Sequence, residues 1–106
     1  MRVQATEKET LNSILDYLLY SGYFVWRNNT GALLTQKGQF MRFGKAGSPD
    51  IIGLTQKGLF LGIEVKSGNK KQTEQQIAFQ GAVEKRGGVY MVARALEDVI
   101  SGLKGL

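Results

Sequence analysis

The stretch that most constrains the fold of this chain is "DIIGLTQKGLFLGIEVKS", which covers residues 50–67. It contains two apolar, β-rich runs, residues 50–56 and 59–67, on either side of a Lys-Gly turn. This pattern predicts a β-hairpin. Pro49, the only proline, directly precedes the first run and fits the start of a strand better than its centre. Because both runs are largely apolar, we expect two buried strands.

Three charged residues interrupt these apolar strands. Successive side chains of a strand point to opposite faces, so Glu64 and Lys66 share the face opposite to Ile63. Asp50 begins the other strand and can approach Glu64 across the sheet. Two adjacent carboxylates repel each other unless a proton or a cation lies between them, and Mg²⁺ needs only one or two carboxylates besides waters and a phosphate. We therefore predict a divalent cation at Asp50 and Glu64, with Lys66 placed to activate a water or to offset phosphate charge.

Each of these motifs also has an ordinary structural interpretation. A Glu-x-Lys pair on one strand is commonly a solvated ion pair of small energetic value, and a Pro-Asp step is a turn signal. The combination of bend, Pro-Asp, apolar strand, turn and apolar strand with Glu-x-Lys favours a functional site.

Composition excludes several kinds of chemistry. The chain has no histidine and no cysteine, which rules out histidine bases, disulfides and zinc sites built from nitrogen and sulfur ligands. Its net charge of +5 favours an anionic partner, with nucleic acid ahead of a membrane surface. No apolar run approaches the ~20 residues of a membrane span, and the first residues lack the apolar core of a signal peptide, so we expect a cytoplasmic protein.

The remaining segments predict one α/β domain over all 106 residues. We expect a helix over residues 5–22, a strand over 23–28, an irregular hairpin or loop over 33–47, a helix over 73–88, a strand over 89–93 and a last helix over 96–105. The order αβ(β)ββαβα predicts a mixed β-sheet flanked by helices, because the strand after the second long helix can join the sheet by a crossover.

Apolar positions within these elements predict the core. The first helix carries an apolar stripe made of Leu11, Ile14, Leu15, Leu18 and Leu19. The second helix has an apolar side made of Ile77, Phe79, Ala82 and Val83. Thr73 is the expected N-cap of the second helix. Aromatic residues in or beside strands are more often core than base-stacking groups, so we also expect the aromatic side chains of Phe24, Trp26, Phe40, Phe43 and Tyr90 in the core.

Asp50 with Glu64-x-Lys66 resembles the signature of the PD-(D/E)xK nuclease superfamily. Within it, "GKAGSPDIIG", "EVKSG" and a helix that carries "TEQQ" and ends in "GG" are similar to the virus-type replication-repair nuclease (VRR-NUC) family. The early stretch "DYLLYSGYFVWRNNTGA" resembles the first helix and strand of that family, so the resemblance covers nearly the whole chain. It implies a restriction-endonuclease-like core and a Mg²⁺ (or Mn²⁺) dependent, structure-selective DNA endonuclease.

The resemblance also implies roles for individual residues. Asp50 and Glu64, with the backbone carbonyl of Val65, would hold the metal, and Lys66 would orient the attacking water. The attack would be direct, without a covalent intermediate. Gln76 stands where the family has a supporting glutamine, and Gln75 and Gln80 remain alternatives.

Such nucleases usually add a glutamate from the first helix, and two residues compete for that place. Helical spacing puts Glu7 on the apolar stripe with Leu11, whereas Glu9 falls on the polar face. We therefore expect Glu7 in the site, although an acidic residue at a helix N-terminus is also favoured by the helix dipole alone.

Basic residues near the motif are candidates for DNA contacts. They are Arg27, Arg42, Lys45, Lys70 and Lys71, and the last two precede a helix N-terminus, which favours anions. Contacts of this kind predict salt-sensitive binding that depends little on base sequence.

The resemblance further implies a substrate and an assembly. We expect branched DNA such as a four-way junction, cut by a homodimer, and a phage or prophage origin. Three alternatives stay open: a DNA-binding module that uses the fold without cutting, a restriction-type nuclease, and an RNA-processing nuclease.

Overall fold

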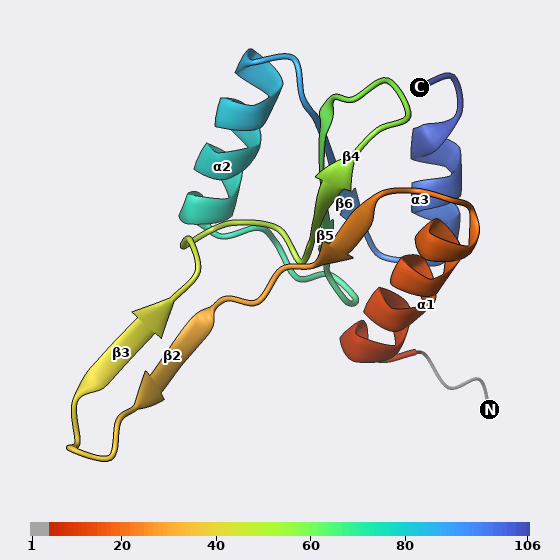
Figure 1. Cartoon of the computed structure of the whole chain (residues 1–106). Coiled ribbons are helices and arrows are strands. Elements are labelled where there is room, and N and C mark those ends of the chain that lie inside the picture. The colour runs from red at the N-terminus through yellow and green to blue at the C-terminus, as the bar shows by residue number, and fades with distance from the viewer. Residues whose placement is uncertain (1–4) are drawn as a thin grey trace.

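The structure, a computed structural model, describes residues 5–106 and combines a four-stranded mixed sheet, three helices and a separate two-stranded hairpin (Figure 1). The elements are α1 (Glu7–Tyr20), β1 (Val25–Arg27), β2 (Gly31–Leu34), β3 (Phe40–Phe43), β4 (Ile51–Leu54), β5 (Phe60–Val65), α2 (Glu74–Lys85), β6 (Val89–Ala93) and α3 (Leu96–Leu103). Within residues 5–106 no helix is long and apolar enough to cross a membrane.

The main sheet has the strand order β1-β4-β5-β6. Strands β1, β4 and β5 pair antiparallel, and β6 pairs parallel to β5 after the crossover through α2. This arrangement confirms the mixed sheet and the crossover that the sequence predicts. Helices α1 and α3 lie together on one side of the sheet, and α2 lies on the other side (Figure 1).

The β4–β5 hairpin forms around the predicted Lys-Gly turn. Gly58 adopts a φ of 84°, a left-handed conformation that glycine accepts without strain. The Thr55 hydroxyl accepts a hydrogen bond from the Leu59 amide at 3.1 Å, which closes the turn. The register pairs Ile51 with Ile63. One step further along the same register, Asp50 stands opposite Glu64.

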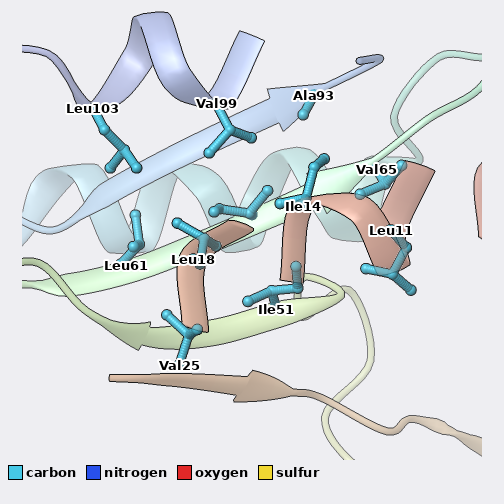
Figure 2. Close-up of a cluster of buried hydrophobic side chains, with 11 residues drawn as sticks. Leu11, Ile14, Leu18, Val25, Ile51, Leu61, Val65, Ala93, Val99 and Leu103 are labelled. Atoms are coloured by element: carbon cyan, nitrogen blue, oxygen red, sulfur yellow. The ribbon is translucent and has the colours of Figure 1, made fainter. Parts of the chain in front are cut away.

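The hydrophobic core fills the space between the sheet and the α1/α3 layer (Figure 2). Its buried members are Leu11, Ile14, Leu18, Val25, Ile51, Leu61, Ile63, Val65, Ala93, Val99 and Leu103. Three residues of the predicted α1 stripe therefore lie in the core, and Leu15 packs partly against it. Leu19 was expected in the same stripe, but its side chain is exposed. It is the residue after Leu18 and therefore lies a further turn of about 100° around the helix, outside the face that packs on the sheet.

The opposite face of the sheet is only partly covered. Thr73 caps α2 as predicted, since its side chain accepts a hydrogen bond from the Gln76 amide. No residue of α2 is buried, however, and Ile77, expected on its apolar side, is exposed. Phe79 and Val83 are half-buried and line a groove of about 730 Å³ between α2 and the β4–β5 turn. The helix thus leaves apolar surface open instead of sealing a second core.

The segment expected to be an irregular hairpin or a loop is a regular hairpin. Strands β2 and β3 pair antiparallel and form a second sheet that projects away from the body (Figure 1). Phe40 and Phe43, expected in the core, are exposed there. Phe24 and Trp26 are also exposed and pack edge-to-face on each other, with ring centroids 5.6 Å apart. The expectation of buried aromatic residues at these four positions is wrong, because the side chains lie on the projecting hairpin or point away from the core that buries Val25 of β1.

We predict that Ile63→Ala lowers the free energy of unfolding by about 2–5 kcal/mol, since the side chain is fully buried and the truncation leaves a cavity. Urea unfolding followed by circular dichroism measures the effect. The matched control is Ile77→Ala on the exposed side of α2, which should change stability by about 0.5 kcal/mol or less. Equal losses in the two variants would contradict this description of the core.

Candidate active site

Asp50 and Glu64 meet at the edge of the sheet where β4 begins and β5 ends. The Val65 amide donates a hydrogen bond of 2.7 Å to Oδ2 of Asp50. This bond holds the Asp50 carboxylate against the end of β5 and leaves its second oxygen available. Lys66 follows directly, and its own amide donates to the Ala93 carbonyl at 3.0 Å. The predicted motif residues are thus brought together by the sheet.

The chain before Asp50 is held by one side chain. The Asn28 side-chain amide donates to the Ser48 hydroxyl at 2.7 Å and to the Pro49 carbonyl at 2.9 Å. The Asn28 backbone amide donates to the Asp50 carbonyl at 2.8 Å. These bonds tie the end of β1 to the start of β4, so Asp50 lies on a braced segment and not on a free loop.

Glu64 is a buried carboxylate without a formed hydrogen bond, and the side chains of Gln72 and Tyr90 are the polar groups near enough to lower its pKa. Its side chain is only 1% exposed, and neither carboxylate oxygen is hydrogen-bonded. The Tyr90 hydroxyl is buried and unpartnered as well. A buried polar group without a partner costs about 1–3 kcal/mol, and more if it is charged. Within residues 5–106 these are the only buried side-chain oxygen or nitrogen atoms in that state, and they lie together. Unbonded buried polar atoms need an explanation, and a bound ligand is one such explanation.

Burial is the main cause of the raised pKa of Glu64. Lys66 and the Gln72 side chain oppose the shift, and the Asp50 carboxylate adds to it. Burial also raises the pKa of Asp50; the Val65 amide opposes that shift, and Glu7 adds to it. Both carboxylates are therefore unfavourable as anions in the protein alone. A bound cation would reverse this preference.

The structure separates the two candidate glutamates of α1. Glu7 accepts a hydrogen bond from the Ser67 amide at 3.1 Å and lies close enough to Asp50 to raise its pKa. Glu9 instead accepts from the Thr6 amide in the capping box of α1. Glu7 is therefore beside Asp50, and Glu9 is occupied at the helix end.

A cavity of about 220 Å³ opens next to Asp50. Its lining residues are Glu7, Lys8, Leu11, Arg27, Asp50 and Val65. This cavity gives a ligand access to the Asp50 carboxylate from the side of α1 and β1.

Gln76 was expected to support the site, but Gln72 is the glutamine that lies near Glu64. Gln76 is the N3 residue of α2, and its side-chain oxygen accepts from the Thr73 amide at 2.8 Å. Gln80 accepts a hydrogen bond of 3.0 Å from the side chain of Gln72. Gln72 is the glutamine close enough to Glu64 to lower its pKa. No sequence pattern reveals Gln72, because it precedes the helix and has no periodic position.

Tyr90 was expected in the core and is buried, but its hydroxyl lies beside Glu64. The parallel register pairs Gly62 with Tyr90 and Glu64 with Val92, so Tyr90 points to the same face as Glu64. Alternation along the last strand could have suggested this face, provided that the register was known. Burial, followed by the Glu64 charge, raises the pKa of Tyr90, so its hydroxyl stays protonated and can donate.

Arg94, which sequence analysis did not single out, holds the loop between β5 and α2. Its guanidinium donates to the Gly68 and Lys70 carbonyls, each at 2.7 Å. Lys70 Nζ in turn lies 3.8 Å from Glu7 Oε2. The loop is therefore tied to the end of β6 on one side and to α1 on the other.

The five basic candidates divide into two groups. Arg27 lies near Asp50 and opposes the increase of its pKa, and Lys70 contacts Glu7. Lys71 is exposed in the same loop. Arg42 lies on the projecting hairpin, and Lys45 at its base beside α2. Basic residues therefore occur both around the carboxylates and on or beside the hairpin.

The donor atoms suit a hard cation. The available groups are carboxylate and backbone oxygens, which Mg²⁺ and Mn²⁺ prefer. Within residues 5–106 no three His, Cys, Asp or Glu residues are grouped closely enough to hold a metal ion. Two carboxylates suffice for Mg²⁺, and the unpartnered oxygens of Glu64 are consistent with that role.

We predict that Glu64→Gln stabilises the metal-free protein at about pH 7. The folded-state pKa of Glu64 is raised above its ordinary value of 4.5, so the folded protein loses stability as pH rises through that raised pKa. The glutamine side chain does not ionise, so the variant does not lose this stability as the pH rises. The gain should shrink towards zero at about pH 4, where the carboxyl is protonated in both states.

Urea unfolding in EDTA at the two pH values measures this difference. The control is Glu97→Gln on the exposed surface of α3, which should show little dependence on pH. A variant that is less stable than the parent protein at neutral pH would count against an uncompensated Glu64 charge.

The comparisons with known proteins support the architecture. No protein-family model matches the chain, and no curated protein matches it. A solved structure described as a "VRR_NUC domain protein" matches with a TM-score of 0.68 and 22% sequence identity, over 93% of this chain and 85% of the other. The chain therefore has the fold of a VRR-NUC domain protein, which confirms the predicted α/β fold class with its mixed sheet flanked by helices.

Proposed function

We propose that this protein is a Mg²⁺ (or Mn²⁺) dependent DNA endonuclease of the VRR-NUC family. The observation that carries the proposal is Glu64, a buried carboxylate with both oxygens unpartnered, next to Asp50 and Lys66 at one edge of the sheet. The shared fold and the match of these residues to the PD-(D/E)xK signature support the same conclusion.

Each residue has a distinct task in this mechanism. The free oxygen of Asp50 and the Glu64 carboxylate would hold the cation, with the Val65 carbonyl as a third donor. When bound, Mg²⁺ supplies a Lewis acid and lowers the pKa of a coordinated water. The Lys66 ammonium lies near both carboxylates, where it can orient the attacking water and offset phosphate charge. Glu7 would assist from α1, and Gln76 stays a predicted supporting residue.

The basic residues would hold the DNA backbone. Arg27 lies near Asp50, Lys70 and Lys71 lie in the loop before α2, Arg42 lies on the hairpin and Lys45 lies just after it. Contacts to phosphates position a duplex without reading its sequence. Selection would then depend on the shape of the DNA.

We predict cleavage of DNA that requires Mg²⁺ or Mn²⁺ and that Asp50→Asn, Glu64→Gln or Lys66→Met reduces by about 100-fold or more. The assay is a panel of labelled duplex, flap and four-way substrates with and without the metal. Glu97→Gln and Lys104→Met, on the exposed surface, are the charge-matched controls and should cleave normally. Circular dichroism checks that each variant is folded.

Three results would replace the proposal by one of its alternatives. Binding without cleavage in both metals would favour a non-cutting DNA-binding module. Cleavage of matched RNA in preference to DNA would favour an RNA-processing enzyme. Cleavage of linear duplex at one fixed sequence would favour a restriction-type nuclease.

We further propose that a homodimer acts on branched DNA such as four-way junctions. The groove beside α2 supports the dimer. It has a volume of about 730 Å³, and its walls include the apolar side chains of Leu59, Phe60, Phe79 and Val83, which a second copy would cover. Two subunits would provide two sites for paired strands of a junction.

We predict that sedimentation equilibrium finds a dimer and that Ala78→Glu, which places a charge in the groove, shifts it to monomer. Ser101→Glu on the exposed side of α3 is the matched control and should remain dimeric. A wild-type monomer that binds a junction as one copy would overturn this part alone and leave the nuclease proposal intact.

A further inference from the structure

The β2–β3 hairpin, residues 31–43, is an arm whose strands pair with each other and, within residues 5–106, with no strand of the main sheet. All eight residues of its two strands are exposed, and it stands clear of the helices and the main sheet (Figure 1). The radius of gyration is 14.9 Å, whereas a compact chain of this length is expected near about 13 Å. An isolated two-stranded hairpin is only marginally stable in water. A partner that covers the arm would therefore stabilise it.

The two faces of the arm are both apolar. The register pairs Leu33 with Met41 on one face and Leu34 with Phe40 on the other. Leu34 is 70% exposed and Phe40 is 65% exposed, and both lie next to the tip. Large apolar side chains grouped on an exposed ribbon indicate a binding surface.

The charge of the arm identifies the kind of partner. Residues 28–49 contain Lys37, Arg42 and Lys45 and no acidic residue. The Arg42 guanidinium lies 5.8 Å from the centre of the Phe40 ring, so a cation and an aromatic face are presented together. The arm offers no acidic side chain that could pair with basic residues of a second copy of this chain. A polyanion with flat bases matches both features.

The base of the arm leads directly to the candidate site. Asn28, which precedes the arm, donates hydrogen bonds to Ser48 and Pro49, which follow it, and the next residue is Asp50. The two connections of the arm to the body therefore meet beside Asp50. A two-stranded ribbon fits the major groove of DNA, and exposed apolar side chains can insert where bases are unstacked.

We propose that the arm binds DNA, with Phe40 and Leu34 packed against bases that are unstacked at a branch or an end, and with Lys37, Arg42 and Lys45 at the phosphates. The inference rests on the proposed nuclease function and specifies the feature of the substrate that this site selects. The arm would hold the unpaired bases while the adjoining backbone enters the site at Asp50.

The test measures DNA binding in EDTA, where no cleavage occurs. Fluorescence anisotropy compares an intact duplex with the same duplex carrying a flap of unpaired bases. Phe40→Ala should weaken flap binding by about 5- to 100-fold, the usual effect of losing one stacked aromatic group, and should change duplex binding much less. Phe40→Tyr, which keeps an aromatic ring, should retain flap affinity. Tyr20→Ala, an exposed aromatic on α1 outside the arm, is the matched control.

A second measurement reports stacking itself. A 2-aminopurine placed in the flap beside the branch should change its fluorescence on binding wild-type protein and the Phe40→Tyr variant, but not on binding Phe40→Ala. Equal flap affinity and equal 2-aminopurine signals for Phe40→Ala and wild type would overturn the inference. Conversion of a wild-type dimer to monomer by Phe40→Ala in the absence of DNA would also overturn it, because the arm would then bind a second copy.

Failure of the nuclease proposal would look different. If no metal supports cleavage, but Phe40→Ala still loses flap affinity selectively, the arm binds DNA and the proposed reaction is wrong. If cleavage depends on Asp50 and Glu64 while the arm variants bind like wild type, the reaction stands and the arm inference is wrong.

Discussion

The antiparallel register of β4 and β5 is the constraint on which both the core and the site depend. It pairs Ile51 with Ile63 in the core and thereby puts Asp50 opposite Glu64. A slip by one residue would turn every β5 side chain to the other face. Glu64 would then enter the core. The hydrophobic packing that stabilises the register therefore also specifies the geometry of the carboxylates.

The two sides of the sheet contribute differently to stability. The side of α1 and α3 is densely filled and holds the buried aliphatic residues. The side of α2 contains Glu64, Tyr90 and Gln72 beneath a helix with no buried residue. Burying a carboxylate without a partner is costly, and the core on the other side offsets that cost. Such an imbalance is expected where a site is formed at the expense of local stability.

Much of the site follows from local rules that act on sequence. Strand alternation places Glu64 on the face opposite to Ile63. Helical spacing favours Glu7 over Glu9 as the residue beside the carboxylates, and in the structure Glu7 binds the Ser67 amide whereas Glu9 belongs to a capping box. Gln72 could not be found in this way. Its position beside Glu64 depends on the path of the loop that Arg94 ties to β6. The roles of these residues in a reaction stay predictions.

The sequence by itself determined the order of the helices and of the main-sheet strands, the β4–β5 hairpin and the residues that alternate between core and site, because these depend on neighbours close along the chain. Only the tertiary structure decided which apolar surfaces are covered. Phe40 and Phe43 have the pattern of core aromatics, yet they lie on an arm that no other element reaches. Periodicity describes one face of an element, whereas burial requires a second element packed against that face, and that depends on contacts far apart in the chain.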